Sequence, residues 1–428
     1  MLNIESRNGW YTAVVKVPKK LQPILGKAKF SQALGTTNPR EAQRLAAPFI
    51  ARWKFEIEKA RGGHGIAAKA AQEWRTYFTE QAAAIECEPE GARREALEAG
   101  MDELRSSFVD QLRSLPEAQA DTLAGLVDGS RTLTSEYFEA WKSQLDLAPK
   151  TIDQMSRDIA LLIERFVTLD GITKEGVLLF LSDLERAGKG PATIKRVLCS
   201  YRNYWSYLQD SHVVSIEHDP FDLQRLLAGK FKRAAKKKAQ RRAFSPANVV
   251  HLWSLAVDRG DQQLADLIVL GAYTGARIEE LCSLKGDDVN PESFIVREAK
   301  TNAGVREVPI HSALVPLMAR LKASTKDGYL LSGLTFNKYG DRSNAIGKRF
   351  GRLKESAGFD GTLVFHSLRK TLITLLEQAG IPENFCCDIV GHEKGTIGYG
   401  HYSGGASLAN KRDAIENVSY PFPDGTVV

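Results

Sequence analysis

The spacing of apolar positions predicts a small sheet at the start of the chain and long helical regions after it. Residues 10–17 alternate in part between apolar and polar side chains, and 30–34 follow a turn signal, so both segments are expected to be strands. Asn38 and Pro39 then suit the N-cap and first position of a helix that ends before Gly62. The first region is therefore expected to combine a short sheet with one helix.

Helical spacing dominates the next part of the chain. Residues 64–128 contain few turn signals and carry an acidic block, which predicts a helical spacer with a solvated surface or a protein-contact face. Leu133-Thr-Ser-Glu136 is a candidate capping box ahead of an aromatic run. Further helices are expected at 150–167, 173–187 and 191–209.

A third region starts near Phe244. Ser245 suits the N-cap of a helix and Pro246 its first position. Strand patterns at 293–297 and 305–310 flank a short run of turn residues, which predicts a hairpin with Lys300 at or beside its tip.

These patterns predict a multi-domain, mainly α chain with a small β-rich domain at its N-terminus, an all-helical middle domain and a mixed α+β C-terminal domain. At 428 residues the chain is too long for one ordinary core. We expect a sheet plus helix at 1–62, a helical spacer at 63–128, a helical domain at 129–228, a basic linker at 229–242, and a mixed domain with a C-terminal tail at 243–428.

Composition narrows the class of protein. No apolar run approaches the length of a membrane span, and the N-terminus lacks the apolar core of a signal peptide, so a cytoplasmic location is expected. The five cysteines form no CxxC pair, and no phosphate-cradling glycine loop or metal-ligand spacing stands out. The sequence therefore predicts no metal and no cofactor.

Positive charge is concentrated rather than spread. The net charge of +6 is mild, but eight of the thirteen residues from Lys230 are Lys or Arg. Such a run suits a disordered tail or a localisation signal, and between two folded domains it also suits a linker that follows a duplex backbone. Helix 191–209 mixes basic and core positions, and its aromatic side chains are expected in the core. The candidate DNA-contacting residues are Lys195, Arg196, Arg202, Lys230, Lys232, Arg233, Lys236, Lys237, Lys238, Arg241 and Arg242.

The candidate chemistry begins with His366 and Arg369. Three residues apart on a helix, they lie about one turn from each other and can grip one phosphate. His392 follows, and then Tyr399 and Tyr402 in a glycine-rich segment. A tyrosine beside a cationic pocket is a candidate nucleophile toward phosphorus. An HxxR pair alone is a common accident, so the upstream residues decide its meaning.

Upstream, Arg277 stands at an expected helix start, with Glu280 and Asp288 as structural acids near it. The ordered set Arg277, Lys300, His366, Arg369, His392 and Tyr402 resembles the active-site signature of the tyrosine recombinases, the phage integrase family. The resemblance covers roughly residues 243–418. The N-terminal segment also resembles the small domain found ahead of the catalytic region in many phage-type integrases, which implies an accessory DNA contact at 1–62. More weakly, 129–228 resembles their core-binding domain, which implies a helical DNA-binding domain there and a catalytic domain with a C-terminal assembly tail at 243–428.

The resemblance implies a site-specific recombinase that cuts and rejoins DNA through a covalent 3′-phosphotyrosine and moves a mobile element. Arg277 and Arg369 would clamp the phosphate, and Lys300 would protonate the leaving 5′ oxygen. His366 would accept the tyrosine proton or orient the phosphate, His392 would bond a nonbridging oxygen, and Tyr402 would attack. Double-stranded attachment sites, a homotetramer on paired sites, a directionality factor and association with the nucleoid are the implied partners and setting.

Two other functions stay open, a type IB topoisomerase and a noncatalytic DNA-binding regulator of the same fold. The match also has two departures: Lys370 replaces a frequent histidine, and Tyr402 follows His392 by ten residues, slightly more than is usual. Tyr399 is the other candidate nucleophile. In the tail, the helical spacing of Leu408, Ile415 and Val418 predicts an assembly element with little to pack against in its own chain.

Overall fold

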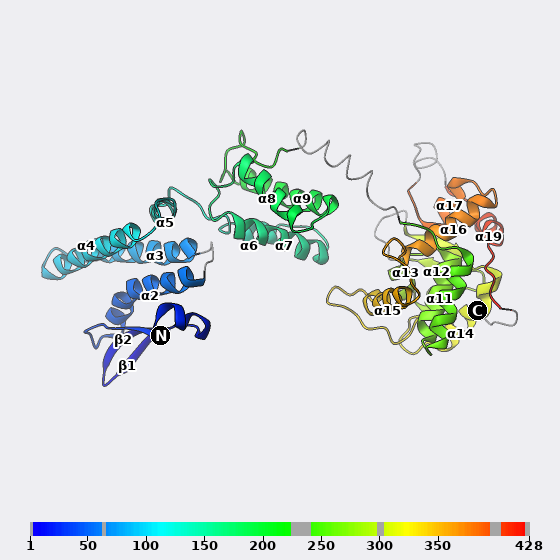
Figure 1. Ribbon diagram of the computed structural model, residues 1–428, viewed down its shortest axis with the longest axis horizontal. Coiled ribbons are helices and arrows are strands. Elements are labelled where there is room, and N and C mark those ends of the chain that lie inside the picture. The colour runs from blue at the N-terminus through cyan, green and yellow to red at the C-terminus, as the bar shows by residue number, and fades with distance from the viewer. Residues whose placement is uncertain (1–2, 62–65, 224–240, 298–303, 394–403, 424–428) are drawn as a thin grey trace. The chain divides into compact units, whose positions relative to one another are not determined.

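The computed structural model describes residues 3–61, 66–223, 241–297, 304–393 and 404–423. The chain divides into two compact units, 1–236 and 237–428, which are shown in Figure 1 and described one at a time. Helices dominate both units, and the described residues form one three-stranded and one two-stranded sheet. The predicted fold class is confirmed. Among the described helices, none is long and apolar enough to cross a bilayer.

The first unit starts with a meander packed on one long helix. Its strands pair antiparallel in the order β1 (Ile4–Arg7), β2 (Trp10–Lys16), β3 (Lys29–Ala33), and its helices are η1 (Lys19–Leu21), α1 (Gln22–Leu25) and α2 (Pro39–Arg61). Phe30 stacks on Trp53 of α2 at 5.6 Å between ring centroids, and this contact closes a small core. The strands at 10–17 and 30–34 and the helix from Pro39 are confirmed. β1 was not predicted, because its sequence IESR has no apolar alternation.

The rest of the first unit is helical. Its helices are α3 (Ile66–Cys87), α4 (Ala92–Arg113), α5 (Glu117–Asp128), α6 (Phe138–Ser143), α7 (Pro149–Arg165), α8 (Lys174–Arg186) and α9 (Pro191–Asp210). The three helices predicted from 150 to 209 are confirmed. Tyr201, Tyr204 and Trp205 of α9 are buried in the core that α9 shares with α6, α7 and α8, as expected of core aromatic residues.

The predicted capping box at 133–136 is wrong. Helix α6 begins at Phe138 without a side-chain cap. The backbone N–H of Thr134 donates to Val167 O at 3.0 Å, and its carbonyl accepts from the Tyr204 hydroxyl at 2.7 Å. The segment is therefore held by bonds to distant parts of the unit, which override the local helix-start signal.

The second unit surrounds one large core. Its elements are α11 (Pro246–Asp258), α12 (Gln262–Thr274), α13 (Ile278–Cys282), η2 (Gly286–Asp288), β4 (Ser293–Val296), β5 (Arg306–Pro309), η4 (Ser312–Leu314), α14 (Val315–Ala323), α15 (Ser343–Ser356), α16 (His366–Gln378), α17 (Glu383–Val390) and α19 (Leu408–Ile415). Ser245 caps α11 by accepting from the Asn248 N–H, as predicted. β4 and β5 pair antiparallel, so the predicted hairpin is confirmed.

Two glycines allow α12 and α16 to pack closely. A Cβ atom on Gly271 would lie 2.7 Å from Cζ of Phe365, and one on Gly275 would lie 2.8 Å from Cδ2 of Leu372. Gly275 also ends α12 with φ 59°, a left-handed conformation that favours glycine. Because side chains are absent at these two positions, the end of α12 can lie against the start of α16.

The C-terminal segment packs on its own unit, which contradicts the basis of the expected assembly tail. Ile415 and Val418 are each 1% exposed within the core of the second unit. The Tyr420 hydroxyl donates to Ala272 O at 2.9 Å, and the Phe422 ring meets Trp253 edge to face. The apolar spacing in this tail is explained by packing within the chain, because α19 covers β5 and α17.

Replacing Ile415 by Ala should destabilise the second unit by about 2–5 kcal/mol, because a fully buried side chain leaves a cavity. The same change at Leu408, which is partly exposed on the same helix, should cost less than half as much. Urea unfolding monitored by tryptophan fluorescence would measure both. Equal and small losses in the two variants would contradict packing of the tail on its own unit.

Candidate active site

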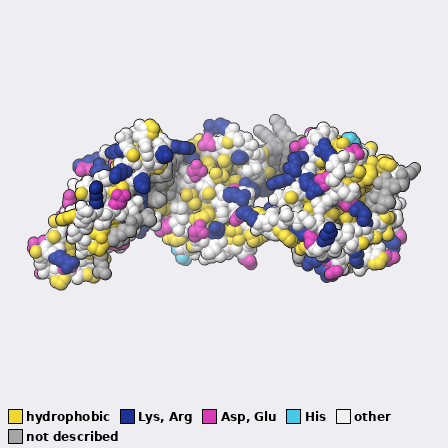
Figure 2. Space-filling model, turned by 90° about the horizontal axis from the view of Figure 1, so that it is seen from below, with side chains coloured by type: hydrophobic (Ala, Val, Ile, Leu, Met, Phe, Trp, Pro, Cys, Tyr) yellow, Lys and Arg dark blue, Asp and Glu magenta, His cyan; other side chains and the backbone are white. Residues whose placement is uncertain are grey.

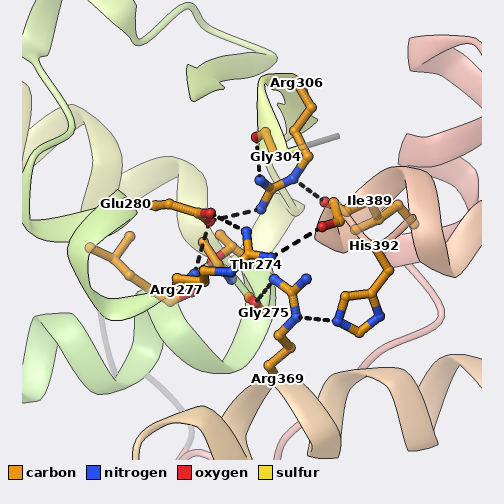
Figure 3. A network of polar contacts seen from close by, with 12 residues as sticks. Thr274, Gly275, Arg277, Glu280, Gly304, Arg306, Arg369, Ile389 and His392 are labelled. Atoms are coloured by element: carbon orange, nitrogen blue, oxygen red, sulfur yellow. Dashed lines mark hydrogen bonds and ion pairs between the residues drawn. The ribbon is translucent and has the colours of Figure 1, made fainter. Parts of the chain in front are cut away.

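Four of the predicted site residues lie in the part of the second unit where α12 meets α16. Arg277 precedes α13, His366 and Arg369 lie in the first turn of α16, and His392 follows α17. The close approach at Gly275 brings these segments together, although they are far apart in sequence. Figure 3 shows Arg277, Arg369 and His392 near one another, as the sequence predicted.

A buried carboxylate holds Arg277 in place. Glu280 accepts from the Arg277 guanidinium at 2.6 Å and from its backbone N–H at 2.9 Å. A longer bond of 3.4 Å joins Arg277 Nη2 to Gly391 O. The prediction that Glu280 is a structural acid beside Arg277 is confirmed. Asp288 pairs with Arg297, the residue after β4, and its expected place near Arg277 stays a prediction.

Arg306 is a site residue that the sequence reasoning missed. It starts β5, and its side chain is 6% exposed. It donates to Glu280 Oε2 at 3.1 Å, to Ile389 O at 2.8 Å and to Gly304 O at 2.7 Å. The alternation of β5 could have indicated it, since Arg306 shares a strand face with the buried Val308, and a buried arginine needs an acceptor.

Arg369 is almost fully buried but not fully bonded. Its Nη1 donates to Gly275 O at 3.0 Å and its Nε to His392 Nε2 at 3.2 Å. Its Nη2 is buried and has no hydrogen-bond partner among the described residues. Burial and the like charges of Arg277 and Arg306 lower the pKa of Arg369, and the guanidinium still stays protonated at neutral pH. This donor, which no described residue bonds, could bond an anion.

His392 is held as a neutral imidazole. Its Nε2 accepts from Arg369, so the proton of the neutral ring is on Nδ1, which can donate a hydrogen bond. Partial burial and the guanidinium charges of Arg369 and Arg277 lower the pKa of His392 to about 4. Gly391 ends α17 in a left-handed turn, and the His392 N–H bonds Cys387 O, which fixes the position of the ring.

His366 lies at the exposed start of α16. Partial burial and the positive charges of Arg369, Arg241 and Arg277 lower its pKa, so this imidazole is also neutral at neutral pH and can accept a proton. Lys370, the departure noted in the sequence, donates to Arg241 O at 2.8 Å. This bond ties the end of the basic linker to α16.

The other predicted site residues fall into two groups. Lys300, Tyr399, Tyr402 and the linker residues Lys230, Lys232, Arg233, Lys236, Lys237 and Lys238 lie outside the described residues. Lys195 and Arg196 are exposed on α9, where Arg196 also pairs with Asp158, and Arg202 donates to Phe221 O. Arg242 is exposed and pairs with Asp360 at 2.8 Å. Contact with DNA stays a prediction for all of them.

The site as described is suited to an anion. Three guanidinium groups, those of Arg277, Arg306 and Arg369, surround the carboxylate of Glu280, which leaves an excess of positive charge. Two neutral imidazoles stand at its edge. Planar guanidinium donors and an Nδ1–H can together bond several oxygens of one phosphodiester.

Comparison with known proteins defines the class. Residues 248–403 match the model of the phage integrase family, and 3–62 match a domain family of unknown function. This part of the second unit is therefore similar to the phage integrase family of tyrosine recombinases, as the sequence resemblance indicated. Arg277, His366, Arg369 and His392 all lie inside the matched region.

The chain is similar to proteins of two kinds. A protein of Caldanaerobacter subterraneus subsp. tengcongensis named as a tyrosine recombinase is 27% identical over 194 residues, which are 44% of this chain and 62% of that protein. The chain thus matches less than two thirds of this relative's length. A lambda integrase tetramer bound to a Holliday junction has a TM-score of 0.50 at 16% identity, covering 97% of this chain and 95% of that one.

A Tn1549 transposon integrase in complex with a circular intermediate DNA also has a TM-score of 0.50, at 22% identity. The match covers 68% of this chain and all of that one. At these identities the likeness shows the fold alone. The lambda integrase match extends it to nearly the whole chain.

Replacing Arg369 by Gln should raise the pKa of His392 from about 4 toward its usual value of about 6.5, because a positive charge and a donor to Nε2 are removed. NMR titration of the imidazole nitrogens would measure the shift. Arg320→Gln is the matched control, because Arg320 pairs with Asp266 away from the site and its loss should leave His392 unchanged.

The same pKa has a consequence for stability. The unfolded chain takes up a proton at His392 before the folded chain does, so the second unit should lose stability as the pH falls from about 6.5 toward 4. The loss over this pH range should be smaller in Arg369→Gln. A pKa of His392 that is the same with and without Arg369 would contradict the geometry described.

Proposed function

We propose that this chain is a site-specific DNA recombinase that cuts and rejoins DNA through a covalent 3′-phosphotyrosine. The observation that carries the proposal is the buried Nη2 of Arg369, which has no partner among the described residues and lies beside Arg277 and His392. A buried, unpaired guanidinium donor is costly unless an anion bonds it. A phosphodiester supplies the oxygens that two arginine side chains and an imidazole can bind together.

The proposed reaction starts with attack of the Tyr402 oxygen on phosphorus. A bond forms between phosphorus and this oxygen, the bond to the 5′ oxygen breaks, and a free 5′ hydroxyl results. His366, neutral as described, would accept the tyrosine proton, and Lys300 would give a proton to the 5′ oxygen. Arg277 and Arg369 would stabilise the charge that grows on the nonbridging oxygens.

Rejoining reverses these steps with a different hydroxyl. The phosphotyrosine bond keeps the energy of the phosphodiester, so a 5′ hydroxyl of a second duplex can attack it and release Tyr402. His392 would donate its Nδ1–H to a nonbridging oxygen in both directions of the reaction. Its low pKa keeps the ring neutral, and the bond from Arg369 to Nε2 leaves the single ring proton on Nδ1. The steps use no metal and no cofactor.

Binding of the duplex is proposed to rest on basic side chains of both units. Lys195 and Arg196 are exposed on α9, and Arg241 is exposed at the end of the linker. Figure 2 shows Lys and Arg side chains gathered along one edge of the visible face of the second unit. Contacts of this kind give affinity without sequence preference and weaken as salt rises. The integration or excision of a mobile element would then need two such duplexes and several copies of the chain.

Tyr402→Phe should abolish the covalent adduct with a nicked suicide duplex, whereas Tyr399→Phe should retain it, because only one tyrosine can attack in line. Denaturing gel electrophoresis would detect the adduct, and peptide mapping would locate the nucleotide. An adduct that persists in Tyr402→Phe would overturn the assignment of the nucleophile. No adduct in the wild type would favour a noncatalytic DNA-binding regulator.

Arg277→Lys should leave duplex affinity nearly unchanged but lower single-turnover cleavage by about 100-fold or more, because an ammonium group cannot replace a two-pronged contact with the transition state. Arg320→Gln serves as a control with an unchanged site. Equal cleavage by the wild type and Arg277→Lys would contradict the proposed phosphate contact.

A two-site recombination assay, run beside a supercoil relaxation assay, separates the recombinase from a type IB topoisomerase. Joining of strands from two different duplexes supports recombination. Relaxation of a single plasmid without exchange between duplexes would assign the chain to the second class.

A further inference from the structure

Arg306 differs from the other two arginines of the site in how its donors are used. Its Nε, Nη1 and Nη2 bond Ile389 O, Gly304 O and Glu280 Oε2. With its side chain 6% exposed, the guanidinium lies inside the protein and faces protein acceptors. Arg369, in contrast, keeps a donor that no described residue bonds. Arg306 is therefore arranged to hold protein groups rather than to bind a ligand.

The three acceptors of Arg306 belong to three different parts of the site. Glu280 is the carboxylate that fixes Arg277 through two bonds. Ile389 lies at the end of α17, two residues before Gly391, whose carbonyl accepts from Arg277, and three before His392. Gly304 precedes β5 at the edge of the described hairpin. One planar group thus joins the hairpin to both sides of the phosphate site (Figure 3).

The positive charge of Arg306 also keeps the Glu280 carboxylate ionised. Burial alone would raise the pKa of Glu280, but the charge of Arg306 and hydrogen bonds from Arg277 and Arg306 outweigh it and lower that pKa. An ionised Glu280 can accept from Arg277 and Arg306 at once. Without Arg306, the Glu280 carboxylate would lose one of its two cationic partners. It could then rotate and would no longer hold Arg277 in one orientation.

We propose that Arg306 is a positioning residue, which sets the orientation of Arg277 through Glu280 and the position of His392 through Ile389. This inference rests on the proposed function, because it assigns Arg306 a part in phosphodiester cleavage. Lysine cannot replace it, since a single ammonium group cannot span three acceptors that lie in the plane of a guanidinium fork.

The test compares wild type, Arg306→Lys and Arg306→Gln as full chains with a nicked suicide duplex. Duplex affinity should stay within about threefold of wild type, while single-turnover formation of the adduct should fall about 100-fold in both variants, the effect expected when a reacting group is displaced by about 1 Å. Arg320→Gln, which also removes an arginine from an ion pair in the same unit, should cleave like wild type.

A double-variant cycle separates positioning from a general structural role. If Arg306 acts through Arg277, adding Arg306→Gln to Arg277→Lys should lower cleavage much less than it does in the wild type, because the contact it supports is already lost. The rate in Arg306→Gln should also fall more steeply than in wild type as the pH is lowered, since Glu280 is then protonated more easily. A merely structural role would leave the shape of the pH profile unchanged.

The outcomes are distinct. A wild-type cleavage rate in Arg306→Lys would overturn the positioning role. So would a double variant whose loss in cleavage rate equals the product of the losses in the two single variants. Loss of both duplex binding and cleavage would also overturn it, because it would show that Arg306 is needed for folding. Absence of any adduct with the wild-type chain would instead overturn the proposed function itself.

Discussion

The site depends on the ion pairs that the Glu280 carboxylate makes with two arginines. The carboxylate is buried, and it accepts from the guanidinium groups of Arg277 and Arg306 at the same time. Two positive charges this close would repel each other in a poorly solvated setting, so the shared carboxylate is what allows them to lie in one core. Breaking such a pair from one side is costly because it leaves an uncompensated buried charge. The geometry of this cationic site is therefore fixed from inside the protein.

Around that carboxylate, some side chains bond only protein acceptors, whereas others keep a donor that a ligand could use. Arg306 gives all of its nitrogens to protein acceptors, whereas Arg369 keeps a buried donor without a described partner. The surplus positive charge also acts on the imidazoles, since it favours their neutral forms. One electrostatic arrangement thus prepares both the anion contacts and the protonation states. One buried carboxylate can therefore hold together a site built from several segments of the chain.

The sequence predicted most of the elements and the order of the site residues, because helix caps, the hairpin and the HxxR spacing are local signals. Ser245, Pro39 and the pair of His366 and Arg369 are examples. It could not predict what depends on distant contacts. Thr134 is bonded to Val167 instead of capping a helix, and Ile415 finds its partners in the core of its own unit. Arg306 has the sequence context of an ordinary strand residue, because its acceptors come from other segments.

The glycines at the end of α12 have a further consequence. Gly271 and Gly275 let this helix touch α16 so closely that a single methyl group on either would meet Phe365 or Leu372. Without that approach, Arg277 and Arg369 would not share a site, and His392 joins them from still later in the chain. A growing or partly unfolded polypeptide therefore does not yet hold Arg277, Arg369 and His392 together. The cationic cluster therefore forms only once the second unit has folded, and its assembly is coupled to the packing of α12 on α16.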